Sequence, residues 1–237
     1  MLNDSSTIVA ISTAAGVGGI GIVRLSGSKA HSIAKNICQL DIQAHKVQFS
    51  TFKDFNGELI DKGIVLFFES PRSFTGEDIV EFQGHGGPIV LNLILNACIQ
   101  FGAQIANPGD FTKRAYLNSK MDLAQAESVV DLINASTDVA AKSAINSLSG
   151  NFSIKINTLL ENLIELRMYI EACLDFPEEE IDFITEGKVE DKLKKLSETI
   201  KEILLTAQQG QLLRDGINIV LIGQPNVGKS SLMNQLS

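Results

Sequence analysis

The stretch IVEFQGHGGPIVLNLILNACIQFG, residues 79–102, places a strand pattern and a helix pattern next to each other. Ile79 to Phe82 are mostly β-branched or aromatic, which predicts a short strand. The glycines of QGHGG follow, and we expect them to adopt backbone angles that other residues avoid. Pro88 then opens an apolar run that stops at Gly102, and these are typical first and last signals of a helix. A strand that leads through glycines into an apolar helix predicts a mixed α/β domain.

The residues before this stretch add further strands and one helix. Residues 7–13 and 20–25 are apolar and β-branched, and AAGVGG between them supplies turn residues, so we expect two strands joined by a loop. Residues 28–40 have a helical pattern. Asn56-Gly57 lies between two strand-like runs, which is a strong hairpin signal.

The residues after Asp110 have a helical periodicity for about a hundred residues. Asp122 and Gln125 have the spacing of a capping box, with aspartate in place of serine or threonine. Gly150 interrupts the pattern, and the apolar stripe that follows in residues 156–174 is expected to be core. The last helix is expected to reach Gly210.

The segment NIVLIGQPNVGKSSLMNQLS, residues 218–237, contains a phosphate-binding motif. Residues 219–222 predict a buried strand, and residues 223–230 fit G-x-x-x-x-G-K-[ST], which is the P-loop pattern. In this motif backbone N–H groups surround phosphate oxygens, Lys229 reaches the outer phosphates and the Ser230 hydroxyl binds magnesium. Seven residues follow Ser230, too few for the other parts of a nucleotide-binding domain, so we expect this chain by itself not to hydrolyse nucleotide.

The charge distribution separates two halves of the chain. Of the 237 residues, 44% are hydrophobic and 20% are charged, which is typical of a soluble protein. Residues 1–120 hold ten basic and ten acidic side chains, whereas residues 121–237 hold ten basic and eighteen acidic ones, so the net charge of −8 lies in the second half. An acidic second half disfavours a nucleic-acid groove there.

We therefore predict an α+β chain with three parts. These are a mixed α/β domain (1–119), an incomplete all-α domain (120–214), and the first strand and P-loop of a Ras-like domain (215–237). Cys38, Cys98 and Cys173 are far apart and have apolar neighbours, so we expect small core residues rather than disulfides or a zinc site. No signal peptide or long apolar run occurs, which predicts a cytoplasmic protein with no membrane association.

Five motifs in order resemble one family, the MnmE (TrmE) tRNA-modification GTPases. They are GIGIVRLSG, FTGEDIVEFQGHGGP, NPGDFTKRAYLNSKMDLAQAESVVDLI, DFPEEEIDF and GQPNVGKSS, and the resemblance runs from about Thr7 to the last residue. It implies an N-terminal domain that binds folate and dimerises, a central helical domain, and a Ras-like G domain inserted in the helical one. Since residues after the G domain complete the helical domain in this family, the resemblance also implies that part of the apolar stripe in residues 156–174 is exposed in this chain.

The resemblance also implies a function and its partners. Members of the family form a heterotetramer with the FAD-containing protein MnmG (GidA) and add an aminomethyl or carboxymethylaminomethyl group to the wobble uridine of certain tRNAs. The implied cofactors are GTP, Mg²⁺, K⁺ and a one-carbon donor, 5-formyl-tetrahydrofolate or 5,10-methylene-tetrahydrofolate.

Three residues match the family's folate contacts: Arg24, Glu81 and Lys120. Their chemistry fits, because Arg24 and Lys120 could meet the carboxylates of the glutamate tail or the pterin carbonyl, and Glu81 suits the N–H edge of a pterin. From the residues alone, each is more often a solvated surface charge. The family resemblance instead favours a folate contact for each of the three residues.

The implied GTP contacts all lie in the P-loop. Asn226 matches the asparagine that helps to hold potassium in this group of GTPases, and the resemblance assigns the magnesium contact to Ser230. The full set of implied GTP-binding residues is Asn226, Val227, Gly228, Lys229, Ser230 and Ser231. No catalytic residue of the family falls within this chain.

One loop departs from the family. Where members commonly have TPPGRGGVGIVR, this chain has TAAGVGGIGIVR. Ala14 and Ala15 leave the loop freer than prolines would, and Val17 removes a positive charge. Folate affinity is the property that this change puts in question.

Several alternatives stay open. His85 could be catalytic, but hydrogen bonding within the glycine-rich turn is the commoner role. Glu178 to Glu180 could bind a cation, but a solvated cluster is the commoner interpretation. Beside the modification GTPase, two functions remain: a folate-dependent one-carbon transferase of the aminomethyltransferase type, and a folate-binding dimerisation module.

Overall fold

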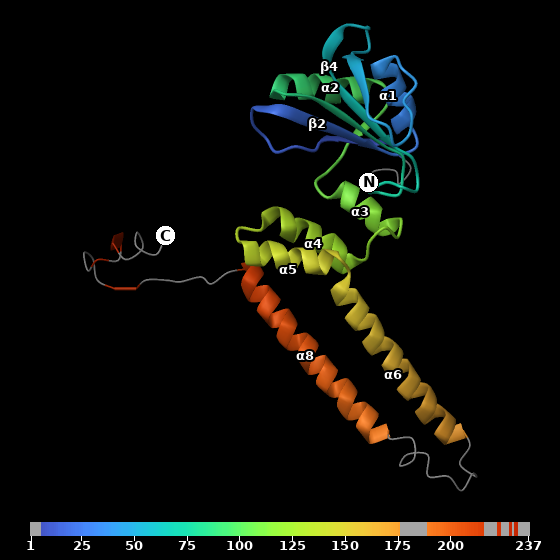
Figure 1. Cartoon of the computed structure of the whole chain (residues 1–237), viewed down its shortest axis with the longest axis vertical. Coiled ribbons are helices and arrows are strands. Elements are labelled where there is room, and N and C mark those ends of the chain that lie inside the picture. The colour runs from blue at the N-terminus through green and yellow to red at the C-terminus, as the bar shows by residue number, and fades with distance from the viewer. Residues whose placement is uncertain (1–5, 176–188, 216–221, 224–227, 229, 232–237) are drawn as a thin grey trace. The chain divides into compact units, whose positions relative to one another are not determined.

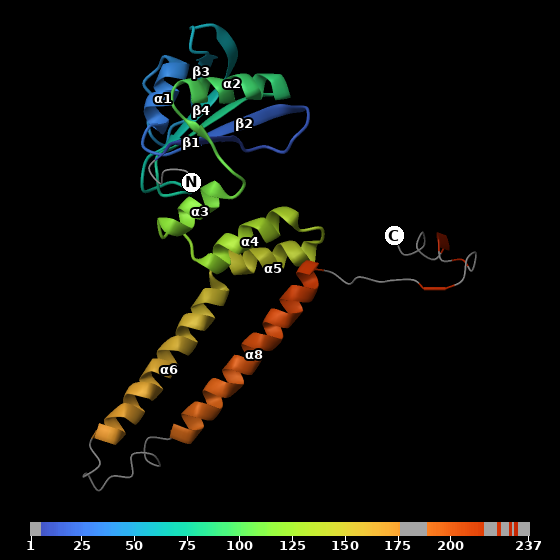
Figure 2. The same cartoon turned by 180° about the vertical axis from the view of Figure 1, so that it is seen from behind.

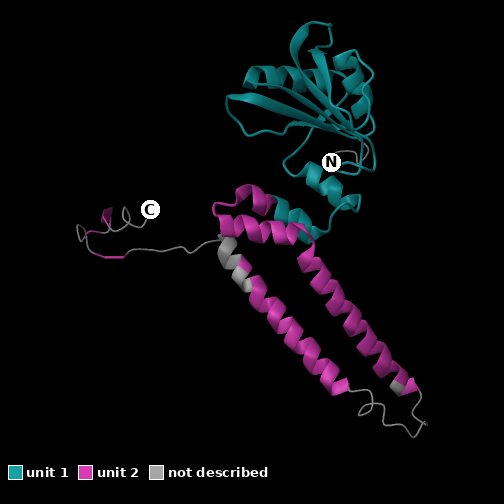
Figure 3. Ribbon diagram, in the orientation of Figure 1, with its two compact units in different colours: residues 1–129 teal, residues 130–237 magenta. Residues whose placement is uncertain are grey.

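The computed structural model (Figure 1) describes residues 6–175, 189–215, 222–223, 228 and 230–231. The chain divides into two compact units, residues 1–129 and 130–237, and the boundary along the chain falls within helix α4 (Leu123–Asn134), as Figure 3 shows. The first unit is mixed α/β and the second is helical, which confirms the predicted fold class. The domain boundaries at 119/120 and 214/215 stay predictions, and residues 219–221 of the expected last strand lie outside the described residues.

The first unit is built on a six-stranded sheet with the order β3-β4-β5-β2-β1-β6. All neighbouring strands are antiparallel except β1 and β6, which are parallel. The strands are β1 (Ile8–Ile11), β2 (Gly18–Ser26), β3 (Gln48–Lys53), β4 (Leu59–Phe68), β5 (Ile79–Gly86) and β6 (Gln104–Ile105). Strands β2 and β5, which are distant in the chain, are therefore neighbours in the middle of the sheet.

Helices α1 (Ala30–Cys38) and α2 (Pro88–Gln100) cover one face of this sheet (Figures 1 and 2). Their buried residues form one core with the alternate strand residues Val23 and Leu25 of β2 and Val80 and Phe82 of β5. Since neighbouring residues of a strand point to opposite faces, the residues between them point away from α1 and α2. The second face of the sheet is thus left for other contacts.

The cysteine prediction is confirmed for two of the three residues. Cys38 and Cys98 are both free and buried in this core. Burial raises the pKa of the Cys38 thiol to about 11 and also raises the pKa of Cys98. The side chain of Cys173 lies outside the described residues.

The expectation about the QGHGG glycines is wrong. Strand β5 continues through this motif to Gly86, and neither Gly84 nor Gly86 has a positive φ. Glycine is needed there for space: a Cβ on Gly84 would lie 2.5 Å from Asp61 Oδ2, and one on Gly86 would lie 2.6 Å from the carbonyl oxygen of Ile20. The motif therefore lets neighbouring groups approach the backbone closely.

A run of helices follows the sheet. Helix α3 (Asp110–Leu117) belongs to the first unit, and α5 (Asp138–Leu148), α6 (Asn151–Asp175) and α8 (Val189–Asp215) belong to the second. The capping box is confirmed, since the Asp122 N–H donates to Gln125 Oε1 and the Gln125 N–H donates to Asp122 Oδ1, both at 2.9 Å. Gly150, with φ of 85°, separates α5 from α6. Helix α8 does not stop at Gly210, because one glycine weakens a helix by only about 1 kcal/mol.

The apolar stripe of α6 is not the core that its pattern predicts. In the described part of α6 only Leu166 is buried among the apolar residues. Leu159 and Tyr169 are half-buried. Seven further apolar residues are exposed, with fractions from 36% to 73%: Ile156, Leu160, Leu163, Ile164, Met168, Ile170 and Leu174. The neighbours of α6 in its own unit are α5 and α8, and they cover only a small part of the stripe. Among the described residues, no helix is both long and apolar enough to cross a membrane.

Candidate functional site

Arg24 and Glu81 form an ion pair in the middle of the sheet. The register places Arg24 of β2 directly opposite Glu81 of β5. Arg24 Nε donates to Glu81 Oε1 at 2.8 Å, and Arg24 Nη2 lies 2.7 Å from the same oxygen. Both side chains point away from α1 and α2, because their neighbours in each strand point into the core. Two of the three expected folate contacts therefore touch each other.

Glu81 keeps one carboxylate oxygen open. Its side chain is 12% exposed, against 30% for Arg24. Both contacts from Arg24 go to Oε1, and no other described residue donates a hydrogen bond to Oε2. No fully buried side-chain oxygen among the described residues lacks a partner, so Oε2 must reach the surface. A mostly buried carboxylate with one open oxygen suits a ligand that presents N–H groups.

Two phenyl rings lie next to the Arg24 guanidinium. Phe74 belongs to the loop of residues 69–78, between β4 and β5, and Phe111 belongs to α3. Each ring centroid is 5.9 Å from Arg24 Cζ, within the range of a cation–π contact. Neither ring is distinctive in the sequence, although each lies inside a motif that carries the family resemblance.

Lys120 lies beside the same loop. Its Nζ donates to the carbonyl oxygen of Pro71 at 3.0 Å, and its side chain is close enough that a Cβ on Gly76 would be 3.2 Å from it. The loop of residues 69–78 thus carries contacts both to Lys120 and, through Phe74, to Arg24. The three predicted folate residues gather around one loop, two of them in direct contact and the third through the loop.

A polar network fixes this loop to α3. Ser26 Oγ donates to Glu77 Oε2 and forms a hydrogen bond with Thr75 Oγ1, both at 2.7 Å. Arg114 of α3 donates from Nη1 to Glu77 Oε2 at 2.9 Å and from Nη2 to the Ser6 carbonyl oxygen at 2.7 Å. Arg114 could not be identified from the sequence, since its partners lie 37 and 108 residues away in the chain.

His85 is paired with a carboxylate at the far end of β5. Asp61 accepts hydrogen bonds at 2.8 Å from the His85 N–H, from His85 Nδ1 and from the Lys62 N–H. Burial would raise the pKa of Asp61, but these hydrogen bonds outweigh it and lower that pKa below its ordinary value. The His85 ring is 75% exposed and makes no other hydrogen bond in the described residues. His85 thus makes hydrogen bonds, as the sequence favoured, but it makes them to Asp61 of β4 and not within a glycine-rich turn, because β5 continues through His85.

The P-loop is described only in part. Gly228 has φ of 90°, a backbone conformation that favours glycine, and Ser230 and Ser231 are helical. Asn226, Val227 and Lys229 lie outside the described residues, as do Glu178 to Glu180. In the parts of the chain that are described, no group of three or more His, Cys, Asp or Glu residues could hold a metal ion. The GTP, magnesium and potassium contacts therefore stay predictions.

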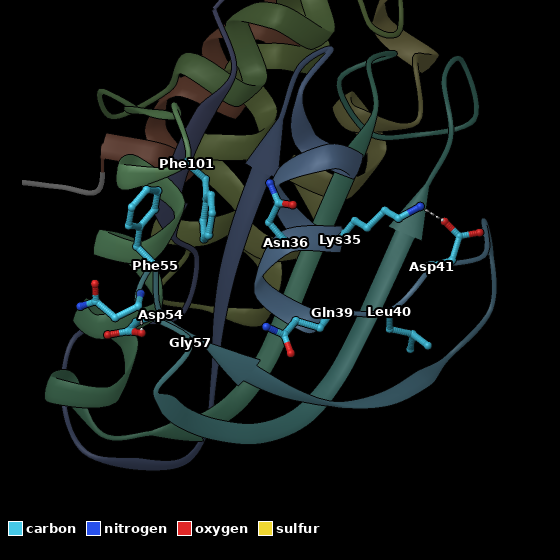
Figure 4. Close-up of a pocket in the computed structure, with 10 residues that line it drawn as sticks. Lys35, Asn36, Gln39, Leu40, Asp41, Asp54, Phe55, Gly57 and Phe101 are labelled. Atoms are coloured by element: carbon cyan, nitrogen blue, oxygen red, sulfur yellow. Dashed lines mark hydrogen bonds and ion pairs between the residues drawn. The ribbon is translucent and has the colours of Figure 1, made fainter.

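An open pocket of about 600 Å³ lies elsewhere on the first unit (Figure 4). It is lined by Lys35 and Asn36 of α1, by the turn of the β3–β4 hairpin and by Phe101, and the rings of Phe55 and Phe101 lie 5.2 Å apart beside it. None of the expected folate residues lines it. The candidate site is thus a surface on the open face of the sheet and not this pocket.

Comparison with known proteins relates the whole chain to one family. A family model described as "GTP-binding protein TrmE N-terminus" matches residues 7–120, and one described as "MnmE helical domain" matches residues 123–234. The chain is 53% identical over 233 residues to the tRNA modification GTPase MnmE of Saccharophagus degradans, covering 98% of this chain and 51% of that protein. It is 50% identical over 237 residues to the protein of the same name from Neisseria meningitidis serogroup B, covering 100% of this chain and 53% of the relative. The chain spans about half the length of the curated relatives it matches.

Proposed function

Because this chain belongs to the MnmE family of tRNA-modification GTPases, we propose that it acts in the modification of the wobble uridine of tRNA. The whole protein is the GTPase component of a complex with MnmG and adds an aminomethyl or carboxymethylaminomethyl group at C5. The first unit binds the one-carbon donor, 5-formyl-tetrahydrofolate or 5,10-methylene-tetrahydrofolate. The P-loop binds GTP with Mg²⁺ and K⁺, through Asn226, Val227, Gly228, Lys229, Ser230 and Ser231.

The observation that supports folate binding best is the Arg24–Glu81 pair. The open Oε2 of Glu81 is an acceptor for the N–H groups of a pterin edge. Arg24 holds the charge of Glu81 in place, and Lys120 adds a cation that suits the carboxylates of the glutamate tail. A carboxylate acceptor next to two cationic side chains fits a reduced folate, because its pterin ring carries N–H donors along one edge and its glutamate tail is anionic.

Titration calorimetry of residues 1–237 with 5-formyl-tetrahydrofolate tests this proposal. Replacing Arg24 with alanine removes a charge-assisted contact and leaves Glu81 unpaired, so folate binding should weaken by about 1.5–3 kcal/mol. Arg167→Ala, an exposed arginine on α6, is the matched control and should bind like the wild type. An unchanged affinity in Arg24→Ala would remove Arg24 from the site, and no heat from the wild type would reject folate binding.

GTP binding is tested in the same instrument. We expect residues 1–237 by themselves to bind GTP weakly, because the segments that read guanine and hold the switch regions are not among them. Addition of GTP should therefore give little heat. Tight GTP binding by this polypeptide would contradict the expectation.

The proposed partners are a second copy of the chain, through the first unit, and MnmG, with tRNA as the substrate of the complex in the cytoplasm. Analytical ultracentrifugation tests self-association, and capture of purified MnmG tests the heterotetramer. The competing function, a one-carbon transferase of the aminomethyltransferase type, requires transfer from folate to a small acceptor without GTP. Detection of that transfer by the whole protein, with no effect on tRNA, would favour the competing function.

A further inference from the structure

Phe74 and Phe111 come from separate segments but approach the same guanidinium. Phe74 is 38% exposed and Phe111 is partly buried, so both rings still present surface to solvent. Each ring centroid lies 5.9 Å from Arg24 Cζ, and Arg24 in turn bonds Glu81 Oε1. Arg24 is therefore in contact both with Glu81 and with two aromatic side chains.

We propose that Phe74 and Phe111 form the aromatic walls against which the pterin ring of a reduced folate packs. This inference rests on the proposed function. The planar pyrimidine ring of a reduced pterin carries the N–H edge, and a ring whose edge meets Glu81 Oε2 lies next to Arg24, the side chain that both phenyl rings contact. Aromatic rings favour offset or edge-to-face packing at centroid distances of about 4.5–7 Å, so the walls select a flat ring over an aliphatic ligand with the same donors.

The polar network holds the two walls together before any ligand binds. Arg114, three residues after Phe111, bonds Glu77, three residues after Phe74, at 2.9 Å. Asn118 Nδ2 adds a second link, donating to the carbonyl oxygen of Thr75 at 2.7 Å. Because these bonds join α3 to the loop of residues 69–78, the ligand does not have to order the walls, and pre-ordering of this kind raises affinity.

In a simpler interpretation, the two phenyl rings do not contact a ligand. Phe74 and Phe111 would then only pack against Arg24 and stabilise its ion pair with Glu81. The two interpretations differ for ligand fragments. If the phenyl rings pack against the pterin, replacing them weakens binding of the ring part of folate and not of its tail. If they only position Arg24, replacing them weakens binding of the whole ligand through Arg24 or lowers protein stability alone.

Calorimetry with Phe74→Leu and Phe111→Leu, each in residues 1–237, tests the proposal. The probes are 5-formyl-tetrahydrofolate, 6-methyltetrahydropterin as the ring alone and p-aminobenzoylglutamate as the tail alone. Each variant should bind the whole folate and the ring about fivefold to tenfold more weakly than the wild type, with no change for the tail. Phe55→Leu, an exposed phenylalanine at the pocket of Figure 4, is the matched control and should change none of the three.

Wild-type affinity for the ring in both variants would overturn the proposal, as would an equal loss for ring and tail. A wild-type protein that binds none of the probes would instead contradict the proposed function, so the two failures are distinguishable. Melting temperatures measured by circular dichroism show whether each variant is folded. Should Phe111→Leu unfold, Phe74→Leu carries the test, and Phe111→Tyr, which keeps the ring, should retain wild-type affinity.

Discussion

Asp61 is a single carboxylate that holds the ends of two strands together. Although burial would raise its pKa, the hydrogen bonds from His85 and Lys62 lower that pKa in the folded protein. The ionised form of Asp61 therefore stabilises the fold. This stabilisation is complete above the pKa of an unfolded aspartate, about 3.9, and is lost as the pH falls through the lower pKa of the folded state.

Replacing Asp61 with asparagine should remove this pH-dependent term. We expect the variant to be less stable than the wild type by about 1 kcal/mol at pH 7, because the amide is a weaker acceptor than the carboxylate. The difference should shrink as the pH falls below about 4. Urea unfolding between pH 3 and pH 7, followed by circular dichroism, measures it, and Glu58→Gln, on an exposed carboxylate of the same unit, is the control. A difference that stays constant over this pH range would contradict the role given to the charge of Asp61.

At the scale of elements, the side chain of Arg114 ties α3 to several other segments of the first unit. Arg114 is 12% exposed, and it donates to Glu77, to the Ser6 carbonyl oxygen and, at 3.4 Å, to the Ser26 carbonyl oxygen. Replacing Arg114 with methionine leaves Glu77, itself only 22% exposed, without this ion partner. We expect a loss of about 2–3 kcal/mol in the stability of the first unit. Lys113→Met, on the exposed side of the same helix, should leave stability unchanged when both are measured by urea unfolding.

Elements set by residues close in the chain could be predicted from the sequence, and those set by distant residues could not. The hairpin turn at Asn56-Gly57 and the capping box at Asp122 each depend on a few neighbouring residues, and both are present. Strand β6 has only two residues and exists because Gln104 and Ile105 pair with β1, so no local sequence pattern predicted it. Locally, the glycines of QGHGG indicated unusual backbone angles, but their role depends on the approach of Asp61 from another strand.

The candidate site follows the same division. The resemblance identified Arg24, Glu81 and Lys120, but the bond between Arg24 and Glu81 depends on the pairing of β2 with β5, which passes over β3 and β4. Phe111 and Arg114 reach this site because α3 returns to the open face of the sheet. A return of that kind depends on the tertiary fold, which local sequence patterns do not specify.

At the scale of the whole molecule, the two units differ in how much apolar surface they bury. The first unit has a continuous core, whereas the buried apolar residues described in the second are only Ala144, Leu166 and Leu196. We expect residues 1–237 to unfold in two steps, with the helical unit melting first by on the order of 10 °C. Hydrogen exchange followed by mass spectrometry should show faster exchange in α6 and α8 than in β2 and β5. A single cooperative transition with equal protection in both units would contradict this expectation.

The contact between Arg114 and Ser6 spans 108 residues of chain. During translation, the N-terminal segment therefore leaves the ribosome long before its anchor on α3 has been made. Arg24 is likewise synthesised 57 residues before its ion-pair partner Glu81. Contacts so distant in sequence slow folding. Until α3 emerges, the nascent first unit lacks the contacts that α3 makes on the open face of its sheet, and in this period it exposes the most surface to a chaperone.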